Sequence, residues 1–262
     1  MDLLYHASYI IDRPLRIGMK LNRYTIQSVL GMGSYGISYV VLDDAGREYV
    51  VKQLRTSKRW SKYGRDSFQY EKKILQALNH PSIPKLVDDF KWRRNLFLVM
   101  ERMPGLTFEE LIFDQHQTYC ERDVFQIIHS ILCIVMYIHK HNIVHRDLRI
   151  PNILYDNHSF SIIDFGLARY IGEQDERIQT FYDEKLRMRN IQFYSDFYAL
   201  GHFALFLLYS GYESTTEHEK PWYEELDIST MGRSILKRML QIAKPYESVE
   251  ELMMDILTFV EE

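Results

Sequence analysis

The chain has 262 residues, of which 46% are hydrophobic, so it can bury a substantial core either as one large domain or as two lobes that share a cleft. Its formal net charge of −4 gives no reason to expect binding to nucleic acid or to an anionic membrane. The longest apolar stretches, 127–138 and 203–209, fall short of the roughly 20 residues that a membrane-spanning helix needs, and the first residues lack the order of a signal peptide. We therefore expect a soluble, cytoplasmic protein with no membrane span.

A glycine-rich stretch, LGMGSYGIS at 30–38, is the first feature with chemical meaning. Gly31, Gly33 and Gly36 have G-x-G-x-x-G spacing, and a strand-like run, a turn (DDAG) and a second strand follow. This order favours a turn between antiparallel strands over the helix start of a dinucleotide-binding fold. Glycines in such a turn let backbone N–H groups approach phosphate oxygens. Taken alone, however, the stretch is best interpreted as an ordinary hairpin that uses glycine.

The second strand and the helix after it predict a buried ion pair. Alternation in REYVVKQL places Val50, Lys52 and Leu54 on one face, so an ammonium group points the same way as two apolar side chains. In the helix expected within 67–80, Glu71 falls in the apolar stripe with Phe68, Leu75 and Leu78. Lone inward charges are usually snorkelling surface residues, but two of opposite sign on neighbouring elements predict a pair between Lys52 and Glu71.

A further hairpin is expected from 85–90 and 96–100, joined by KWRRN and leading into the polar segment ERMPG. ERMPG is interpreted as a hinge whose backbone groups can serve a flat heterocycle. Met100 or Met103 could line that pocket, although core packing is the default for methionine. Near residue 104 the pattern changes from short β-branched segments to long helical ones.

The second half predicts a long buried helix over 124–138, in which Cys133 is expected to be a buried thiol. The loop HRDLRIPN follows, and then a hairpin that returns Asp164 beside Asn152. An amide and a carboxylate offer the hard oxygens that suit Mg²⁺. Asp147 is then free to orient a nucleophile and take its proton, and Arg149 can neutralise charge on a transferring group.

Together these segments resemble eukaryotic-type (Hanks-type) protein kinases in their short bacterial form, similar to the YbdM-like kinases of bacilli. The motifs occur in the family's order: GMGSYG, YVVK at 49–52, Glu71, HRDLRIPN, IDFG at 163–166 and SDFYALG at 195–201. The resemblance implies an α+β, bilobal fold. It has an N-lobe of antiparallel sheet with one main helix (about 24–103) and a mostly helical C-lobe (about 104–262), and 1–23 are an N-terminal extension of unknown role.

The resemblance also implies a role for each matching residue, with ATP and Mg²⁺ as cofactors. Asp147 is the catalytic base, supported by Lys52, Glu71 and Arg149. Asn152 and Asp164 hold Mg²⁺, and Asp196 ties down the catalytic loop. The expected nucleotide-binding residues are Leu30, Gly31, Met32, Gly33, Ser34, Tyr35, Gly36, Ile37, Ser38, Val50, Lys52, Glu101, Met103 and Leu154. The positions of the family's hydrophobic spine fall on Leu75, Leu86, His145 and Phe165.

The sequence departs from the family pattern in the segment after IDFG. No A-P-E is present, and the arginine that normally pairs with its glutamate is missing around AKPYESVEEL. Ser38 replaces the usual valine. Arg149 replaces the lysine of serine/threonine kinases, which keeps the positive charge but changes a compact ammonium group to a planar guanidinium with several donors. Thr180 and Tyr182 are candidate phosphorylation sites, because Arg146 could receive a phosphate.

Three functions are compatible with these residues. The first is a protein kinase that modifies a serine or threonine, itself included, in a protein substrate that the sequence does not identify. The second is a kinase-like phosphotransferase for small molecules, which rarely keeps both the glycine loop and the H-R-D triplet. The third is a pseudokinase that acts as a binding module, which would normally have lost Lys52, Asp147 or Asp164; all three are present.

Overall fold

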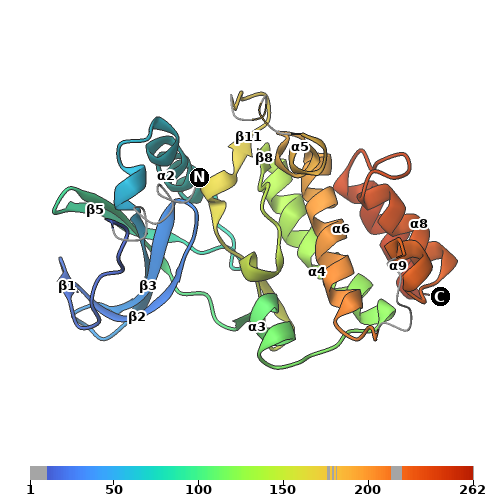
Figure 1. The fold of residues 1–262 in the computed structure, drawn as a ribbon, viewed down its shortest axis with the longest axis horizontal. Helices are drawn as coiled ribbons and strands as arrows, with labels where there is room; N and C mark the ends of the chain where they lie inside the picture. The colour runs from blue at the N-terminus through green and yellow to red at the C-terminus, as the bar shows by residue number, and fades with distance from the viewer. Residues whose placement is uncertain (1–10, 176–177, 179, 181, 214–219, 262) are drawn as a thin grey trace. The chain divides into compact units, whose positions relative to one another are not determined.

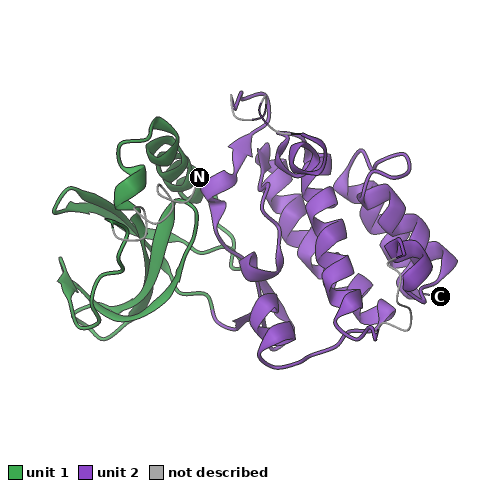
Figure 2. Cartoon of the chain, in the orientation of Figure 1, with its two compact units in different colours: residues 1–103 green, residues 104–262 purple. Residues whose placement is uncertain are grey.

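The computed structural model describes residues 11–175, 178, 180, 182–213 and 220–261. The chain divides into two compact units, residues 1–103 (unit 1) and 104–262 (unit 2), coloured green and purple in Figure 2. The division falls where the sequence changes from β-branched to helical patterns. The α+β prediction is confirmed, because unit 1 is an antiparallel sheet with one main helix and unit 2 is mostly helical (Figure 1).

Unit 1 is built on a six-stranded sheet of order β1-β2-β3-β4-β6-β5 in which every neighbouring pair is antiparallel. Its elements are β1 (Lys20–Leu21), β2 (Tyr24–Met32), β3 (Gly36–Leu42), β4 (Glu48–Leu54), the 3₁₀ turn η1 (Thr56–Lys58), α2 (Lys62–Ala77), β5 (Leu86–Trp92) and β6 (Asn95–Glu101). Both predicted hairpins, β3–β4 and β5–β6, are present.

The two faces of this sheet differ in character. One face forms the core, with these side chains at most 1% exposed: Leu21, Tyr24, Ile26, Ile37, Tyr39, Val41, Val51, Phe97 and Val99. On the other face, Lys52 lies opposite Ser38 on β3 and Leu98 on β6. Directly opposed residues of antiparallel strands point to the same face, so the predicted inward lysine lies on the face away from this core.

Helix α2 starts at Lys62, five residues before the start that the sequence predicted. The Ser61 hydroxyl caps it by accepting from the Gly64 N–H at 3.4 Å. Glycine weakens helices, yet Gly64 lies in the first turn of α2. In the structure a Cβ there would lie 2.5 Å from the Lys58 carbonyl oxygen, so glycine is needed for close packing.

Unit 2 consists of helices with short antiparallel strands between them. Its helices are α3 (Phe108–Phe113), α4 (Glu121–Lys140), α5 (Asp183–Arg189), α6 (Phe193–Tyr209), α7 (Trp222–Glu225), α8 (Thr230–Met239) and α9 (Val249–Glu261), with 3₁₀ turns η2 (Ile150–Asn152) and η3 (Phe165–Leu167). Its strands are β7 (Leu106–Thr107), β8 (Ile143–Val144), β9 (Ile153–Asp156), β10 (Ser159–Ile162) and β11 (Arg169–Tyr170), in the orders β10-β9-β7 and β11-β8.

Helix α4 is the central helix of unit 2 and corrects one expectation. Ile131, Leu132, Ile134 and Val135 are buried, but Cys133 is exposed, so the prediction of a buried thiol was wrong. At about 100° per residue, the four buried positions form one stripe and position 133 falls on the opposite side.

The same helix bears on the expectation that the chain has no membrane span. Among the described residues α4 alone is long and apolar enough to cross a membrane, but half of its apolar stretch is buried against the chain, as in the core helix of a soluble protein. This is weak evidence for a span.

Candidate functional site

The predicted ion pair of unit 1 is present. Lys52 Nζ lies 2.7 Å from Glu71 Oε1, and the two side chains are 11% and 2% exposed. Strand β4 supplies the lysine, and the buried stripe of α2 supplies the glutamate. The pair fixes the ammonium group on the face of the sheet that lies away from the main core, where it can meet an anionic ligand.

The glycine-rich stretch forms the β2–β3 turn, which is closed by a 2.9 Å bond from the Gly33 N–H to the Gly36 carbonyl. Gly36 is needed for packing, because a Cβ there would lie 3.0 Å from Lys52 Cε. Gly31 and Gly33 have negative φ values, and a Cβ would meet nothing within 4 Å at Gly31 and only ordinary contact at Gly33. Neither backbone conformation nor packing within unit 1 requires glycine at 31 and 33, so the chain leaves both positions open to close approach by a ligand.

The other predicted nucleotide-binding residues of unit 1 fall into two groups. Ser38 and Val50 lie half-buried on the face of Lys52. Ile37, by contrast, is 1% exposed in the core on the opposite face, and Met32 pairs with it and packs against the same core. The Ile37 side chain is therefore closed to a ligand, while the Met32 side chain is partly exposed. The remaining positions, Leu30, Ser34, Tyr35, Glu101 and Met103, are exposed or half-buried.

In unit 2 the centre of the predicted site is the carboxylate of Asp147, which is 5% exposed. Oδ1 accepts from Arg149 Nε at 2.7 Å and from Arg189 Nη1 at 2.8 Å. Oδ2 accepts from Asn152 Nδ2 at 2.9 Å and from Arg149 Nη2 at 3.2 Å. A carboxylate offers about four lone-pair positions, so these bonds orient the group completely.

Asn152 and Asp164 are adjacent as predicted, because the Ile163 N–H donates to the Asn152 carbonyl oxygen at 3.0 Å at the base of the β9–β10 hairpin. The Asn152 amide nitrogen donates to the backbone carbonyl and to the carboxylate of Asp147, so the side-chain oxygen of Asn152 is the atom left for a metal. Asp164 has a φ of 62°, and its carboxylate accepts from the Gly166 N–H at 3.2 Å. Non-glycine residues held in the left-handed region are concentrated at functional sites.

The donor set fits magnesium better than zinc. Among the residues that the structure describes, no group of three or more His, Cys, Asp or Glu side chains could hold a metal ion. One amide and one carboxylate oxygen are typical of Mg²⁺, which keeps waters and substrate phosphates as its other ligands.

Asp196 on α6 anchors the loop that carries Asp147 by accepting hydrogen bonds from its backbone. This fully buried carboxylate accepts from the N–H groups of His145 and Arg146 at 2.9 and 2.7 Å and lies 2.9 Å from His139 Nε2. Burial alone would raise the pKa of Asp196, but these hydrogen bonds, that of His139 foremost, hold it below its usual range.

His145 is also buried, and burial lowers its pKa. Its Nδ1 accepts from the Asp147 N–H at 3.2 Å, so Nε2 carries the proton that faces the Ile163 carbonyl. Its ring lies edge-on to Phe165, 4.7 Å between centroids. These two residues are the unit 2 members of the predicted spine, while Leu75 and Leu86 belong to unit 1.

Sequence reasoning missed Arg189, at the end of α5. Besides its contact with Asp147, its guanidinium donates to the Arg146 carbonyl, and Arg146 Nε donates back to the Arg189 carbonyl at 2.6 Å. Arg189 lies outside every motif of the family, and its only signal is that it follows a segment in which A-P-E is absent.

Arg146, expected to receive a phosphate, already has an acidic partner. Its Nη1 and Nη2 lie 3.2 and 3.1 Å from Asp175 Oδ2, and its side chain is 1% exposed. Asp175 thus supplies the negative charge that the prediction assigned to a phosphate. Of the two candidate phosphorylation sites, Thr180 is exposed and Tyr182 is 80% exposed; their modification stays a prediction.

The region of the missing arginine, around AKPYESVEEL, is filled by a different cluster. Tyr246 is 1% exposed, its hydroxyl donates to Asp255 at 2.8 Å, and the guanidinium of Arg238 lies 3.8 Å from its ring centroid. This cluster joins α8 to α9.

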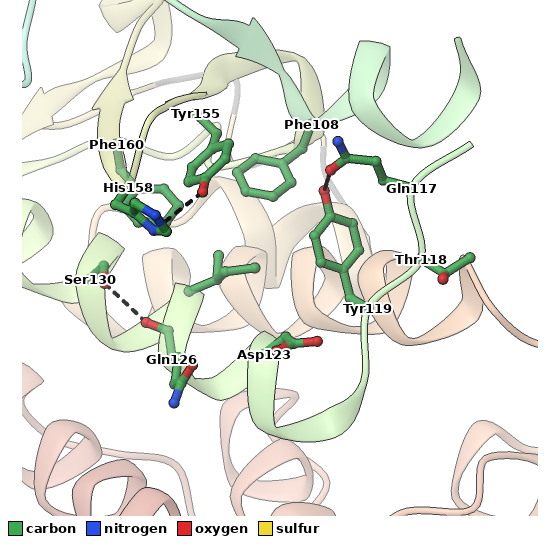
Figure 3. Close-up of a pocket in the computed structure, with 11 residues that line it drawn as sticks. Phe108, Gln117, Thr118, Tyr119, Asp123, Gln126, Ser130, Tyr155, His158 and Phe160 are labelled. Atoms are coloured by element: carbon green, nitrogen blue, oxygen red, sulfur yellow. Dashed lines mark hydrogen bonds between the residues drawn. The ribbon is translucent and has the colours of Figure 1, made fainter. Parts of the chain in front are cut away.

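Unit 2 also contains a pocket of about 450 Å³, shown in Figure 3. Aromatic side chains from α3, the loop before α4 and the β9–β10 hairpin line it, among them Phe108, Tyr119 and Tyr155. Burial raises the pKa of Tyr119 to about 12. No predicted site residue lines this pocket, and we assign the chemistry to the network around Asp147 instead.

Comparisons with known proteins agree with this geometry. The family described as protein kinase domain matches residues 24–261. The chain is 35% identical over 258 residues to the probable serine/threonine-protein kinase YbdM of Bacillus subtilis, covering 98% of this chain and 97% of that protein. It is 31% identical over 162 residues to NUAK family SNF1-like kinase 1 of Mus musculus, covering 61% of this chain and 24% of that protein.

A solved structure matches the fold. The kinase domain of Mycobacterium tuberculosis PknI superposes with a TM-score of 0.70 at 20% identity, covering 94% of this chain and 99% of that one.

Proposed function

This chain belongs to the protein kinase domain family, and on that premise we propose that it transfers the γ-phosphate of ATP to a serine or threonine hydroxyl of a protein, its own residues included. The bond between the γ-phosphorus and its bridging oxygen breaks, a bond from phosphorus to the acceptor oxygen forms, and ADP leaves. The observation that carries the proposal is the fixed carboxylate of Asp147, oriented by Asn152 and by two arginines.

Asp147 acts as the base that orients the acceptor hydroxyl and takes its proton. For this to happen one of its four bonds must give way to the hydroxyl. Arg149 is the suited partner, because its side chain is 49% exposed while that of Arg189 is 16% exposed and bonded to the catalytic loop. Arg149 can turn toward the transferring phosphate and neutralise its charge, and Arg189 then keeps the carboxylate in place.

In unit 1, the turn with Gly31, Gly33 and Gly36 covers the phosphates, and Lys52 binds the α- and β-phosphates while Glu71 holds it in position. The geometry around Gly31 supports this role, since an added side chain there would meet no atom of the chain within 4 Å. In the same unit, Ser38, Val50, Leu30 and the hinge residues Glu101 and Met103 contact adenine. For Leu154 of unit 2, the resemblance to the family implies the same role.

Asn152 and Asp164 hold Mg²⁺, which when bound neutralises charge on the phosphate oxygens. No observation favours a small molecule as the acceptor, and Lys52, Asp147 and Asp164 are all present, which argues against a pseudokinase.

Incubation with γ-labelled ATP and Mg²⁺ tests the proposal. We expect label on serine or threonine of the chain itself or of an added protein such as casein, and none with the Asp147→Asn variant. Label found only in small molecules, or tight ATP binding without any transfer, would refute protein kinase activity. Phosphoamino-acid analysis of the labelled protein separates serine and threonine from tyrosine.

A further inference from the structure

The N-terminal region before β1 contributes a buried carboxylate to unit 1. Asp12 is 1% exposed. It accepts from the Ser57 N–H at 2.8 Å, from the Ser57 hydroxyl at 2.5 Å and from Arg55 Nε at 2.8 Å. Burial by itself raises the pKa of Asp12, but the bonds from Ser57 and Arg55 hold it below its usual range, so the group is ionised at neutral pH.

The other end of the Arg55 guanidinium reaches the glycine-rich turn. Nη1 donates to the carbonyl of Gly33 at 3.1 Å and lies 3.4 Å from that of Ser34, while the Arg55 backbone N–H donates to the Tyr35 carbonyl at 2.9 Å. The side chain is 13% exposed. Arg55 therefore bridges a carboxylate of the N-terminal region and successive carbonyl groups of the turn.

The segment that carries Asp12 is itself fastened to the sheet. The Leu15 N–H donates to the Tyr39 hydroxyl at 3.1 Å, and the Gly18 N–H donates to the Ile26 carbonyl at 2.8 Å. Leu15 and Met19 pack against the core on the face opposite Lys52. Asp12 is thus a fixed anchor for Arg55.

We infer that Asp12 and Arg55 are positioning residues that hold the glycine-rich turn ready for nucleotide phosphates, an inference that rests on the proposed function. A trans peptide directs its C=O and N–H to opposite sides. When the carbonyls of Gly33 and Ser34 face Arg55, the N–H groups of Ser34 and Tyr35 therefore face away from it, as phosphate binding requires. A turn with glycines has much conformational entropy to lose, and Arg55 removes part of it before the ligand arrives.

Asp12 has a second effect through charge. It neutralises Arg55 and keeps the guanidinium directed at the turn carbonyls. Without the carboxylate, the arginine would be free to leave the turn.

Four variants of the full chain test the inference: Asp12→Asn, Arg55→Met, Arg55→Lys and, as control, Asp44→Asn. Asp44 forms an exposed pair with Lys20, so its loss perturbs unit 1 without reaching the turn. If the ready conformation falls to between a third and a tenth of the population, the KM for ATP rises about three- to tenfold. We expect this rise in the first two variants, with kcat nearly unchanged and the control at the wild-type value.

Arg55→Lys separates positioning from stability. A lysine keeps the positive charge opposite Asp12 but lacks the second donor nitrogen that reaches the turn carbonyls. We expect the KM of this variant to rise as in Arg55→Met, while its thermal midpoint stays near that of the wild type. A KM within twofold of the wild type in Asp12→Asn, or a loss confined to kcat and thermal stability, would overturn the inference and leave the proposed function intact.

Hydrogen exchange without nucleotide gives a readout that does not need activity. The amides of residues 33–36 should exchange faster in Asp12→Asn and Arg55→Met than in the wild type or in Asp44→Asn. Unchanged exchange would overturn the inference even in an active enzyme. Failure of the wild type to transfer phosphate would instead refute the proposed function. The exchange result would still show whether Asp12 and Arg55 hold the glycine-rich turn in place.

Discussion

The two units hold their buried charges in different ways. In unit 1 the ammonium group of Lys52 and the carboxylate of Glu71 form a pair in which both side chains are nearly buried. In unit 2 the carboxylate of Asp147 accepts from two arginines, and one of them, Arg149, is 49% exposed. A buried pair contributes to stability as well as to ligand binding, whereas a half-exposed arginine beside an acid can turn toward an incoming phosphate. Substitutions in the two units should therefore fail differently.

The largest effect is expected for Asp147→Asn. Loss of the positioned base should lower the rate of phosphoryl transfer by about 10²–10⁴. The free energy of unfolding should change little, because the asparagine oxygen can still accept from Arg189 and the half-exposed Arg149 can be solvated. Transfer rates and urea unfolding measure the two quantities. Asp156→Asn, on β9 and outside the network, is the control. If Asp147→Asn lost activity because it unfolds, the expected difference between the units, loss of activity without loss of stability in unit 2, would be contradicted.

Lys52→Met, unlike Asp147→Asn, should lower stability as well as activity. It takes the ammonium group away from the buried carboxylate of Glu71, which should lower the free energy of unfolding by about 3–5 kcal/mol. The double variant Lys52→Met/Glu71→Gln should recover most of that stability and none of the activity. Urea unfolding of the three proteins checks this. A single variant as stable as the wild type would mean that the pair does not behave as a buried one.

Arg189→Gln sharpens the account of unit 2. Removing one charge-assisted hydrogen bond of about 1.5–3 kcal/mol should lower kcat at least about tenfold. Arg187→Gln, an exposed arginine on the same helix, should leave kcat unchanged. Because Arg189 acts through Asp147, adding Arg189→Gln to Asp147→Asn should cost nothing further. An additive loss of kcat would show that Arg189 affects the reaction independently of Asp147.

The smallest effect concerns pH. Burial lowers the pKa of His145, so the unfolded chain binds this proton at a higher pH than the folded one. The contribution of the neutral imidazole to stability is present above the unfolded pKa of about 6.5 and is lost as the pH falls below it, by at most about 1.4 kcal/mol per pH unit. Unfolding from pH 7.5 to 5.5 measures it, and histidine NMR should find His145 uncharged where exposed histidines are protonated.

Much of this molecule could be predicted from sequence because its signals are local. Period-2 and period-3.6 patterns were sufficient to pair Lys52 with Glu71, and a short hairpin was sufficient to bring Asp164 beside Asn152. The exposure of Cys133 was missed because an apolar run was taken as buried on all sides. The start of α2 at Lys62 was not predicted, because it depends on the Ser61 cap and on close packing at Gly64, which no periodic pattern shows.

Contacts between distant side chains could not be predicted in the same way. Asp12 meets Arg55 across 43 positions, and Arg189 meets Asp147 across 42. No periodicity or motif connects these residues, and each lies in a segment whose position is set by the packing of the rest of its unit.

The ion pair of Arg146 with Asp175 has a consequence for control of the enzyme. A phosphate is added after synthesis and can be taken off again, whereas an aspartate is encoded in the gene and is there as soon as the chain leaves the ribosome. No phosphatase can remove it. The negative charge beside Arg146 is therefore constant for as long as the chain stays folded.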